Sequence, residues 1–356
     1  MKKIKDILFL LSLCAVILFF GIAILLMPPR EFSAKENRNL AKAPKISVGS
    51  LLNGEYFTAL GDFYKDQFPL RDSFTAIHSL AELSLGKIEC NGVIPTADGK
   101  LIALPKYDDV SLIRRNLISI QANKSILYVP PRAIDLAKES LPSAYCFEDD
   151  VTHFLPKDTA KLFNQFLDSG NSYYNTDHHW TTHSAYFAYT QICEKLQITP
   201  YPKDFFKPET VSENFYGTSF SKSGLPSALV SPDIIELYRY EGDNGFELYL
   251  HDTNQSFSGF YHYDALSTTD KYRVFLGGNY AHLSVKAAES KERPKLLLVK
   301  DSFANSLIPF LALHYDIEVI DPRYCTRAFF YEQLKRDDFD NRLFVLSFDT
   351  LASKLF

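Results

Sequence analysis

The sequence has few of the residues that build metal-bound or disulfide-stapled proteins. Its 356 residues include five cysteines and no CxxC pair, so the spacing typical of zinc and thiol-redox motifs is absent. Cys14 lies in an apolar N-terminal run. The other four are widely spaced, which leaves any pairing outside the cell open: Cys90, Cys146, Cys193 and Cys325.

A basic stripe is also missing. The net charge is −5 and no basic run occurs beyond the N-terminus, which argues against a nucleic-acid partner. Internal repeats and low-complexity tracts are absent as well. One tryptophan contrasts with 29 phenylalanines and 21 tyrosines; most of these rings are expected in the core, although aromatic surfaces also suit sugar rings.

Metal-site patterns are incomplete. His179 and His183 have the four-residue spacing that can hold zinc on a helix, but no glutamate lies between them, so the HExxH protease pattern fails. The string Asp177-His178-His179 also occurs in phosphoesterases with paired metals, yet the further Asp-rich motifs of such sites are not evident. We therefore expect no metal and no cofactor.

The N-terminus can cross a membrane. Ile7 to Met27 is a run of 21 residues without a charge, long enough for the ~30 Å hydrocarbon core. Lys2, Lys3 and Lys5 precede it, which predicts a cytoplasmic N-terminus and an extracytoplasmic body. The run exceeds the h-region of a cleaved signal peptide and no small-residue cleavage pattern follows, so we expect a retained single-pass anchor over 1–27.

Three further parts are expected after the anchor. Pro28 to Ser50 has the composition of an extended polar linker, and 51–356 of a folded body. Helical periodicity begins at Leu51 and ends at Asp66-Gln67-Phe68-Pro69. Within the body, 233–285 is predicted to be a β-rich insertion, in which 234–240 and 246–251 form a hairpin and 272–276 adds a strand.

Strands and helices alternate in the C-terminal third of the chain. Buried strands are expected at 296–299, 317–320 and 343–348, with helices at 303–314 and 327–334 between them. This alternation predicts an α/β fold with a parallel sheet and flanking helices. Such sheets bind ligands at the carboxyl ends of their strands.

Two polar stretches are expected at those strand ends. Asp177-His178-His179-Trp180 follows a short apolar run and precedes a helix capped by Thr181. Ser302 stands at the turn between a strand and a helix, where free N–H groups can hold an oxyanion. An acid, an imidazole and a hydroxyl are the parts of an acyl-transfer triad.

Simpler roles exist for each of these residues. Asp301 and Ser302 can serve only as the N-cap of the following helix. Asp177 and His178 can make local hydrogen bonds in their loop. Asn305 can be an ordinary helix residue or a donor to the oxyanion, and Trp180 a buried ring or a wall of the pocket. Their joint occurrence favours a catalytic set.

On these motifs the chain resembles the DHHW family of bacterial surface proteins and, more distantly, the SGNH-hydrolase-like domain of alginate O-acetylation proteins. The matching stretches are Phe32 to Arg38, Asp66 to Asp72, Asp177 to Trp180 and Asp301-Ser302-Phe303. The resemblance implies an SGNH-like fold and a nucleophilic serine after the Asp-x-His-Trp element. A rival stretch, Gly217-Thr218-Ser219-Phe220-Ser221, resembles the relatives' serine motif literally, so Ser219 competes with Ser302.

We prefer Ser302, because only this serine lies at a strand-to-helix turn. In the expected mechanism His179 takes the proton of Ser302, Asp177 orients the imidazole, and His178 is the alternate base. The resemblance implies O-acetylation or deacetylation of a cell-envelope polysaccharide, with a membrane acyltransferase as a possible acetyl donor. The alternative is a noncatalytic glycan-binding surface protein on the same fold.

Overall fold

The computed structural model describes residues 2–33, 38–105, 110–122, 125–137, 141, 151–288 and 292–355. Contacts between Cα atoms divide the chain into two compact units. Unit 1 comprises residues 1–91 and 221–229, and unit 2 comprises 92–220 and 230–356. This division does not test the expected ends of the anchor at residue 27 and of the linker at residue 50, which stay predictions.

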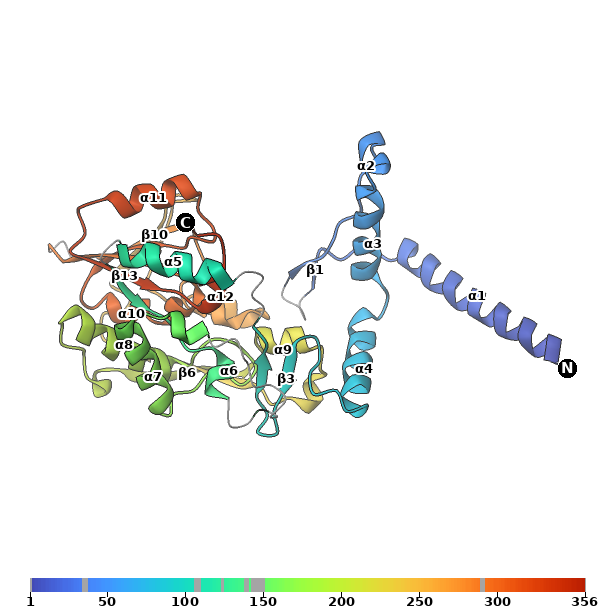
Figure 1. The fold of residues 1–356 in the computed structure, drawn as a ribbon, viewed down its shortest axis with the longest axis horizontal. Coiled ribbons are helices and arrows are strands. Elements are labelled where there is room, and N and C mark those ends of the chain that lie inside the picture. The colour runs from blue at the N-terminus through green and yellow to red at the C-terminus, as the bar shows by residue number, and fades with distance from the viewer. Residues whose placement is uncertain are drawn as a thin grey trace. The chain divides into compact units, whose positions relative to one another are not determined.

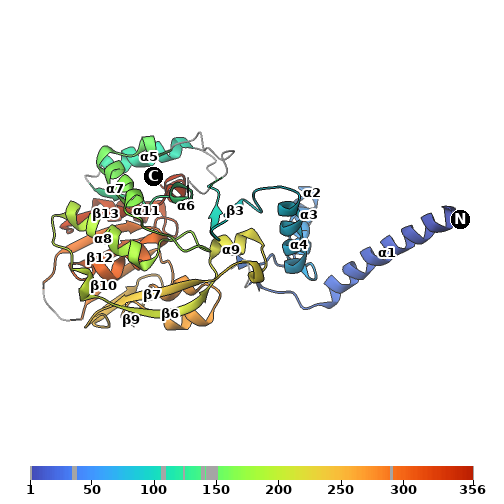
Figure 2. The same cartoon turned by 90° about the horizontal axis from the view of Figure 1, so that it is seen from below.

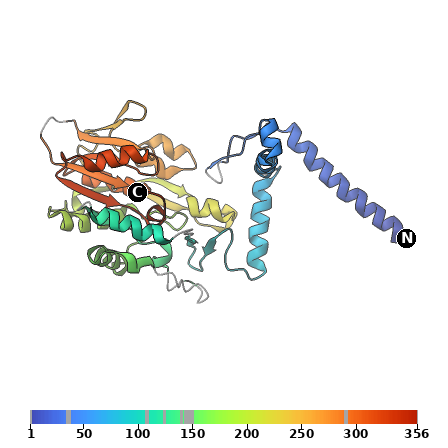
Figure 3. The same ribbon diagram turned by 45° about the horizontal axis from the view of Figure 1, so that its top comes forward.

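Unit 1 begins with one long apolar helix. Helix α1 (Lys2–Leu26) is uninterrupted (Figure 3), and its segment Lys3–Ile24 is long and apolar enough to cross a membrane. Three helices follow: α2 (Val48–Leu52), α3 (Glu55–Gln67) and α4 (Arg71–Ser84). The helical periodicity predicted from Leu51 to Pro69 corresponds to the end of α2 and to α3. Pro69 lies between α3 and α4 and separates them, because proline has no N–H to donate within a helix.

Two of the motifs behind the family resemblance meet in unit 1. The short strands β1 (Phe32–Ser33) and β2 (Arg38–Asn39) pair with each other, and Arg38 is the first residue of β2. Its guanidinium binds both carboxylate oxygens of Asp66, at 2.5 and 2.8 Å. The hydrogen bonds from Arg38, together with the N–H of Ala41, lower the pKa of Asp66 to about 2 against the effect of burial. Part of the expected linker is therefore tied to α3.

The core of unit 2 is one seven-stranded sheet (Figure 1). Its order is β5-β13-β11-β12-β10-β8-β9. Four neighbouring strands are parallel, as the strand-helix alternation predicted: β5 (Ile126–Tyr128), β13 (Asn341–Val345), β11 (Lys295–Lys300) and β12 (Asp316–Ile320). Three antiparallel strands extend it: β10 (His282–Ala287), β8 (Phe246–Leu250) and β9 (Gln255–Ser258).

Helices cover both faces of this sheet. On one face α8 (Thr182–Leu196) and α10 (Ile308–Leu311) pack on alternate residues of β11 such as Leu296 and Leu298. On the other face Leu297 and Val299 of the same strand meet three further helices (Figure 1): α5 (Val110–Ala122), α11 (Arg327–Lys335) and α12 (Phe348–Leu351). Helix α7 (Lys157–Asp168) packs near β5. The predicted α/β class is confirmed: the sheet has parallel strands, and helices cover both of its faces, as parallel sheets require.

The β-rich segment differs from the expectation in two places. Strand β7 (Asp233–Arg239) pairs with β6 (Lys207–Phe215) in a separate ribbon (Figure 2), not with β8 in a hairpin. The predicted strand at 272–276 is the 3₁₀ turn η7 (Lys271–Val274). Both predictions were wrong because alternation of apolar residues marks a strand's buried face without saying which strand it pairs with, and a short apolar run need not be a strand.

The remaining elements are short. Strands β3 (Val93–Pro95) and β4 (Leu101–Ala103) form a hairpin, and Gly99 in the connecting turn has a positive φ of 87°, which glycine adopts readily. Helix α6 spans Ala133–Leu136 and α9 spans Thr218–Ser223. Cys14, Cys193 and Cys325 are free thiols, while Cys146 lies outside the described residues.

Candidate active site

The Asp-His-His-Trp segment is a hydrogen-bonded loop that precedes α8. Tyr173 and Trp180 form an isolated antiparallel bridge, and Thr181 caps α8 through the N–H of Ser184, as predicted. Before the aspartate, the buried carboxylate of Asp233 accepts the N–H groups of Asn175 and Thr176 at 2.8 Å each. Asp177 was expected at the end of a sheet strand. It lies instead in a loop that these hydrogen bonds stabilise.

Ser302 lies two residues after the end of strand β11, which has a parallel neighbour on each side. The carboxylate of Asp301 accepts the N–H of Phe303 at 3.1 Å and that of Ser347 at 2.7 Å, so Asp301 caps the turn and ties it to the start of α12. The turn is the 3₁₀ segment η8 (Ser302–Ser306) followed by α10. The single helix expected over 303–314 is thus divided, since Pro309 in the first turn of α10 cannot continue the earlier ladder.

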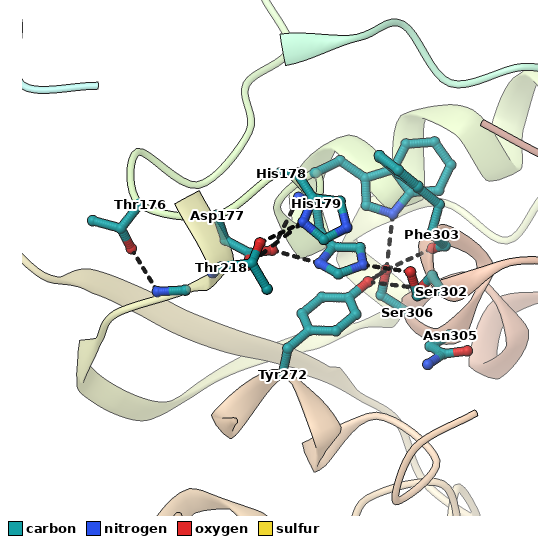
Figure 4. A network of polar contacts seen from close by, with 12 residues as sticks. Thr176, Asp177, His178, His179, Thr218, Tyr272, Ser302, Phe303, Asn305 and Ser306 are labelled. Atoms are coloured by element: carbon teal, nitrogen blue, oxygen red, sulfur yellow. Dashed lines mark hydrogen bonds and ion pairs between the residues drawn. The ribbon is translucent and has the colours of Figure 1, made fainter. Parts of the chain in front are cut away.

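The fold joins these two segments through one imidazole (Figure 4). Nε2 of His179 lies 2.8 Å from Oγ of Ser302, and Nδ1 of the same ring lies 2.5 Å from Oδ1 of Asp177. All three side chains are buried; Ser302 is 9% exposed. Residues 123 positions apart therefore form one continuous chain of hydrogen bonds, with the ring oriented between an acceptor and a hydroxyl.

Asp177 carries the negative charge of this hydrogen-bonded triad. Burial alone would raise the pKa of this carboxyl, but the adjacent imidazoles of His179 and His178 and the N–H of Thr218 bring it well below its usual value. Asp177 is thus a carboxylate that accepts the Nδ1–H of His179. This acceptor leaves Nε2 of His179 as the nitrogen that faces Ser302 without a proton.

His178 occupies the solvent side of the site. Its side chain is 38% exposed, its ring packs against His179, and its Nδ1 lies beside the hydroxyl of Thr218 at 2.5 Å. Desolvation, and secondly the imidazole of His179, lower the pKa of His178 to about 4. At neutral pH this ring is uncharged, and no hydrogen bond connects it with Ser302 in the part of the chain that the structure describes.

The rival serine motif has a different place in the site. Thr218 donates both its N–H, at 2.7 Å, and its hydroxyl, at 2.8 Å, to Oδ2 of Asp177. A Cβ atom at Gly217 would fall 2.2 Å from Cβ of Asp177, so this position requires glycine. Ser219 is buried, and among the described residues it makes no hydrogen bond with His178 or His179. The motif holds the acid, a role that sequence reasoning missed.

Aromatic rings enclose the imidazole of His179. The ring of Tyr272 lies parallel to it, with centroids 3.9 Å apart and 6° between the planes, and its hydroxyl reaches Oγ of Ser306 at 3.2 Å. Trp180 is fully buried, donates to the same Oγ of Ser306 at 2.9 Å and packs on Phe166. Trp180 is therefore a core residue. Tyr272 could not be identified from the sequence as part of the site, because this chain has many aromatic residues and no motif marks this one.

Asn305 lies behind the serine in a buried polar network. Its amide N–H groups donate to the carbonyl of Gly278 and to Oδ1 of Asn279, and its Oδ1 accepts from Nζ of Lys300 at 2.7 Å. The structure thus shows Asn305 with partners other than a substrate. Its role as an oxyanion donor stays a prediction.

The Asp177-His178-His179 cluster fits a catalytic triad better than a metal site. Asp177, His178 and His179 offer donor atoms within 4.8 Å of one another. Both nitrogens of His179 are already engaged, one with the carboxylate and one with Ser302. His183, which the four-residue spacing had paired with His179, lies instead beside the hydroxyl of Tyr238 at 3.3 Å.

Comparison with known proteins agrees with the motifs. Residues 163–320 match the model of the DHHW protein family, which confirms the resemblance inferred from the sequence. This match spans Asp177 to Trp180 and Ser302. No curated protein sequence matches the chain.

The fold is shared with two solved structures, a DHHW family protein and PatB1. A DHHW family protein from Eubacterium siraeum DSM 15702 is 21% identical, with a TM-score of 0.57 over 75% of this chain and 94% of that one. PatB1 of Bacillus cereus is 20% identical, with a TM-score of 0.57 over 74% and 98% of the two chains; it has also been solved with a sulfonyl adduct. The O-acetyltransferase domain of Pseudomonas putida AlgJ is 16% identical, covers 74% and 94%, and has a TM-score of 0.42.

Proposed function

We propose that this chain with a DHHW core is a membrane-anchored serine acyltransferase or esterase that adds acetyl groups to a cell-envelope polysaccharide or removes them. The observation that carries the proposal is the unbroken hydrogen-bonded chain from Asp177 through His179 to Ser302. An isolated cap serine would not need a buried imidazole at 2.8 Å whose other nitrogen faces a carboxylate.

The roles follow from the directions of these hydrogen bonds. His179 removes the proton of Ser302 through Nε2 while Oγ attacks the acyl carbon, and the new imidazolium is stabilised by Asp177. Return of that proton to the leaving alcohol gives an acyl-serine. Water or a sugar hydroxyl then attacks this ester, His179 again accepts and returns one proton, and Ser302 is regenerated.

The setting of this chemistry is also part of the proposal. Helix α1 is long enough to span a bilayer core and carries Lys2, Lys3 and Lys5 at its N-terminal end, which supports an anchor with a cytoplasmic N-terminus and an extracytoplasmic catalytic unit. A polysaccharide acceptor and a membrane acyltransferase as acetyl donor are supported by the family resemblance stated above. The exposed ring of His178 marks the side from which an acyl group would enter.

Covalent labelling tests the nucleophile. Because a relative is solved with a sulfonyl adduct, we expect phenylmethylsulfonyl fluoride to sulfonylate the full chain once, at Oγ of Ser302, with loss of fluoride. Peptide mass spectrometry would locate the adduct. Ser219→Ala is the matched control and should label like the native chain. Labelling at Ser219, or none at any serine, would contradict the triad and favour a noncatalytic glycan-binding protein.

A second test concerns the support of the acid. Gly217→Ala places a methyl group against Asp177 and must displace either the carboxylate or α9. We expect hydrolysis of a chromogenic acetyl ester to fall about 10²-fold, the effect of displacing a catalytic group by about 1 Å. Gly61→Ala, where nothing lies within 4 Å of the new Cβ, should leave turnover unchanged. Equal rates for the two variants would show that Gly217 does not position the site.

A further inference from the structure

A second group of titratable side chains lies elsewhere on the seven-stranded sheet. His251 directly follows β8, His282 is the first residue of β10 and Glu318 is the middle residue of β12. One nitrogen of each imidazole and one carboxylate oxygen all lie within 4.8 Å of one another. Nε2 of His282 and Oε2 of Glu318 are 2.8 Å apart.

This cluster is on the opposite face of the sheet from α8. Glu318 alternates with Ile317 and Val319, which pack in the core beneath α8, so its side chain points toward α11. There Phe329 of α11 contacts the ring of His282, with centroids 5.3 Å apart. Trp180 and Phe303, which flank the triad, belong to the α8 side. The cluster is therefore separate from the proposed acyl-transfer site.

Strand pairing holds the three donors in register. Ser284 of β10 lies opposite Glu318 of β12, and the N–H of His251 donates to the carbonyl of His282 at 3.2 Å. The hydroxyl of Ser284 donates to Glu318 at 2.7 Å and lies 2.6 Å from Nε2 of His251. Such a hydroxyl is the kind of outer partner that orients a carboxylate ligand.

The two imidazoles of the cluster lie face to face. The rings of His251 and His282 are stacked 3.6 Å apart with 6° between their planes. Carboxylates and neutral imidazoles are the forms of these side chains that bind metals.

We propose that His251, His282 and Glu318 bind one divalent transition-metal ion, with Zn²⁺ the best match. Two imidazole nitrogens and one carboxylate oxygen are a recurrent zinc ligand set that leaves a fourth position for water. Ligands about 2.1 Å from a tetrahedral ion are roughly 3.4 Å apart, so His282 and Glu318 need to separate only slightly. One ring nitrogen of the exposed His251 already lies within 4.8 Å of both other donor atoms.

The ion would join the last parallel strand, β12, to the antiparallel strands beside it. Its ligands come from the three neighbouring segments β8, β10 and β12, which enter this sheet from distant parts of the sequence. The side chains of His282 and Glu318 are 12% and 18% exposed, whereas His251 is exposed and lies on the side from which an ion can enter. A bound ion stabilises the folded state by mass action.

Titration of the metal-free full chain in detergent micelles with Co²⁺ alone tests this inference, because cobalt reports its coordination through visible absorption. We expect one equivalent to bind, to be displaced by Zn²⁺ and to raise the melting temperature. Glu318→Gln and His282→Gln should each weaken Co²⁺ binding by at least about 100-fold, the upper range for loss of an outer partner. Ser284→Ala should weaken it by about 10–100-fold.

Two histidine variants serve as controls. His178→Gln alters the other cluster of possible ligands, and His78→Gln alters an exposed His-Glu pair with Glu82 at 3.5 Å; both should retain the site. Melting without metal verifies that each variant is folded. Binding by the native chain that survives Glu318→Gln and His282→Gln, or no binding by the native chain, would overturn the proposal. Labelling of Ser302 is unaffected by either result, so the two proposals are tested separately.

Discussion

Replacement of Ser302 by alanine is expected to reduce kcat for ester turnover by about 10⁶-fold, the loss found when a serine triad is deprived of its nucleophile. Oγ of Ser302 is the hydroxyl that His179 reaches at 2.8 Å, and removing it leaves the imidazole with no nucleophile to activate. The side chain is small and nearly buried, so the variant is expected to fold. The measurement is kcat/KM for a chromogenic acetyl ester with the full chain in detergent.

Two controls separate chemistry from folding. Ser219→Ala removes a buried hydroxyl of the same size that makes no contact with the imidazoles among the described residues, and should retain full turnover. Ser306→Ala removes the hydroxyl that accepts from Trp180 and is expected to lower the melting temperature more than the rate. Activity that survives Ser302→Ala and is lost in Ser219→Ala would assign the nucleophile to the GTSFS stretch instead.

Replacement of Asp177 by asparagine is expected to reduce kcat by about 10⁴-fold with little change in KM. Oδ1 of Asp177 accepts from Nδ1 and the N–H of His179, and Oδ2 accepts from the N–H and hydroxyl of Thr218. An amide has only one acceptor oxygen, so in either orientation its NH₂ faces a backbone N–H. With NH₂ toward His179, the ring must place its proton on Nε2 and can no longer deprotonate Ser302.

The pattern of variants distinguishes this tautomer effect from simple loosening. Thr218→Val keeps the N–H bond to Asp177 and loses only the hydroxyl, and should cost about tenfold, consistent with one hydrogen bond to a charged group. His178→Gln should retain most of the activity, because that ring does not contact Ser302. A loss in Asp177→Asn no larger than in Thr218→Val would mean that the carboxylate does not govern the protonation of His179.

Several features of the site could be predicted because they depend on local chemistry. Ser302 follows an uninterrupted apolar strand and precedes a turn capped by Asp301, a pattern that is visible in the sequence and present in the structure. Thr181 was identified as the cap of α8 for the same reason. The three side chains of the candidate triad were therefore named from sequence, although their proximity could only be inferred from the order of strands.

Other features depend on contacts that no local pattern encodes. Gly217 and Thr218 resemble a nucleophile motif, but they lie against Asp177 and hold its carboxylate. Tyr272 stacks on His179 from a 3₁₀ turn that looked like a strand. The pairing of β7 with β6 in place of β8 was likewise invisible, because alternation shows which face of a strand is buried and not which strand lies beside it.

Sequence alone determined the apolar N-terminal helix, the α/β class and the residue types of the candidate triad, since hydrophobic length, periodicity and caps act over a few neighbouring residues. The tertiary structure decided which hydroxyl faces His179, what restrains Asp177 and that His251, His282 and Glu318 share one face. Those arrangements depend on strand order and side-chain packing between segments tens to more than a hundred residues apart. The contacts that stabilise these arrangements form only when the whole sheet is folded.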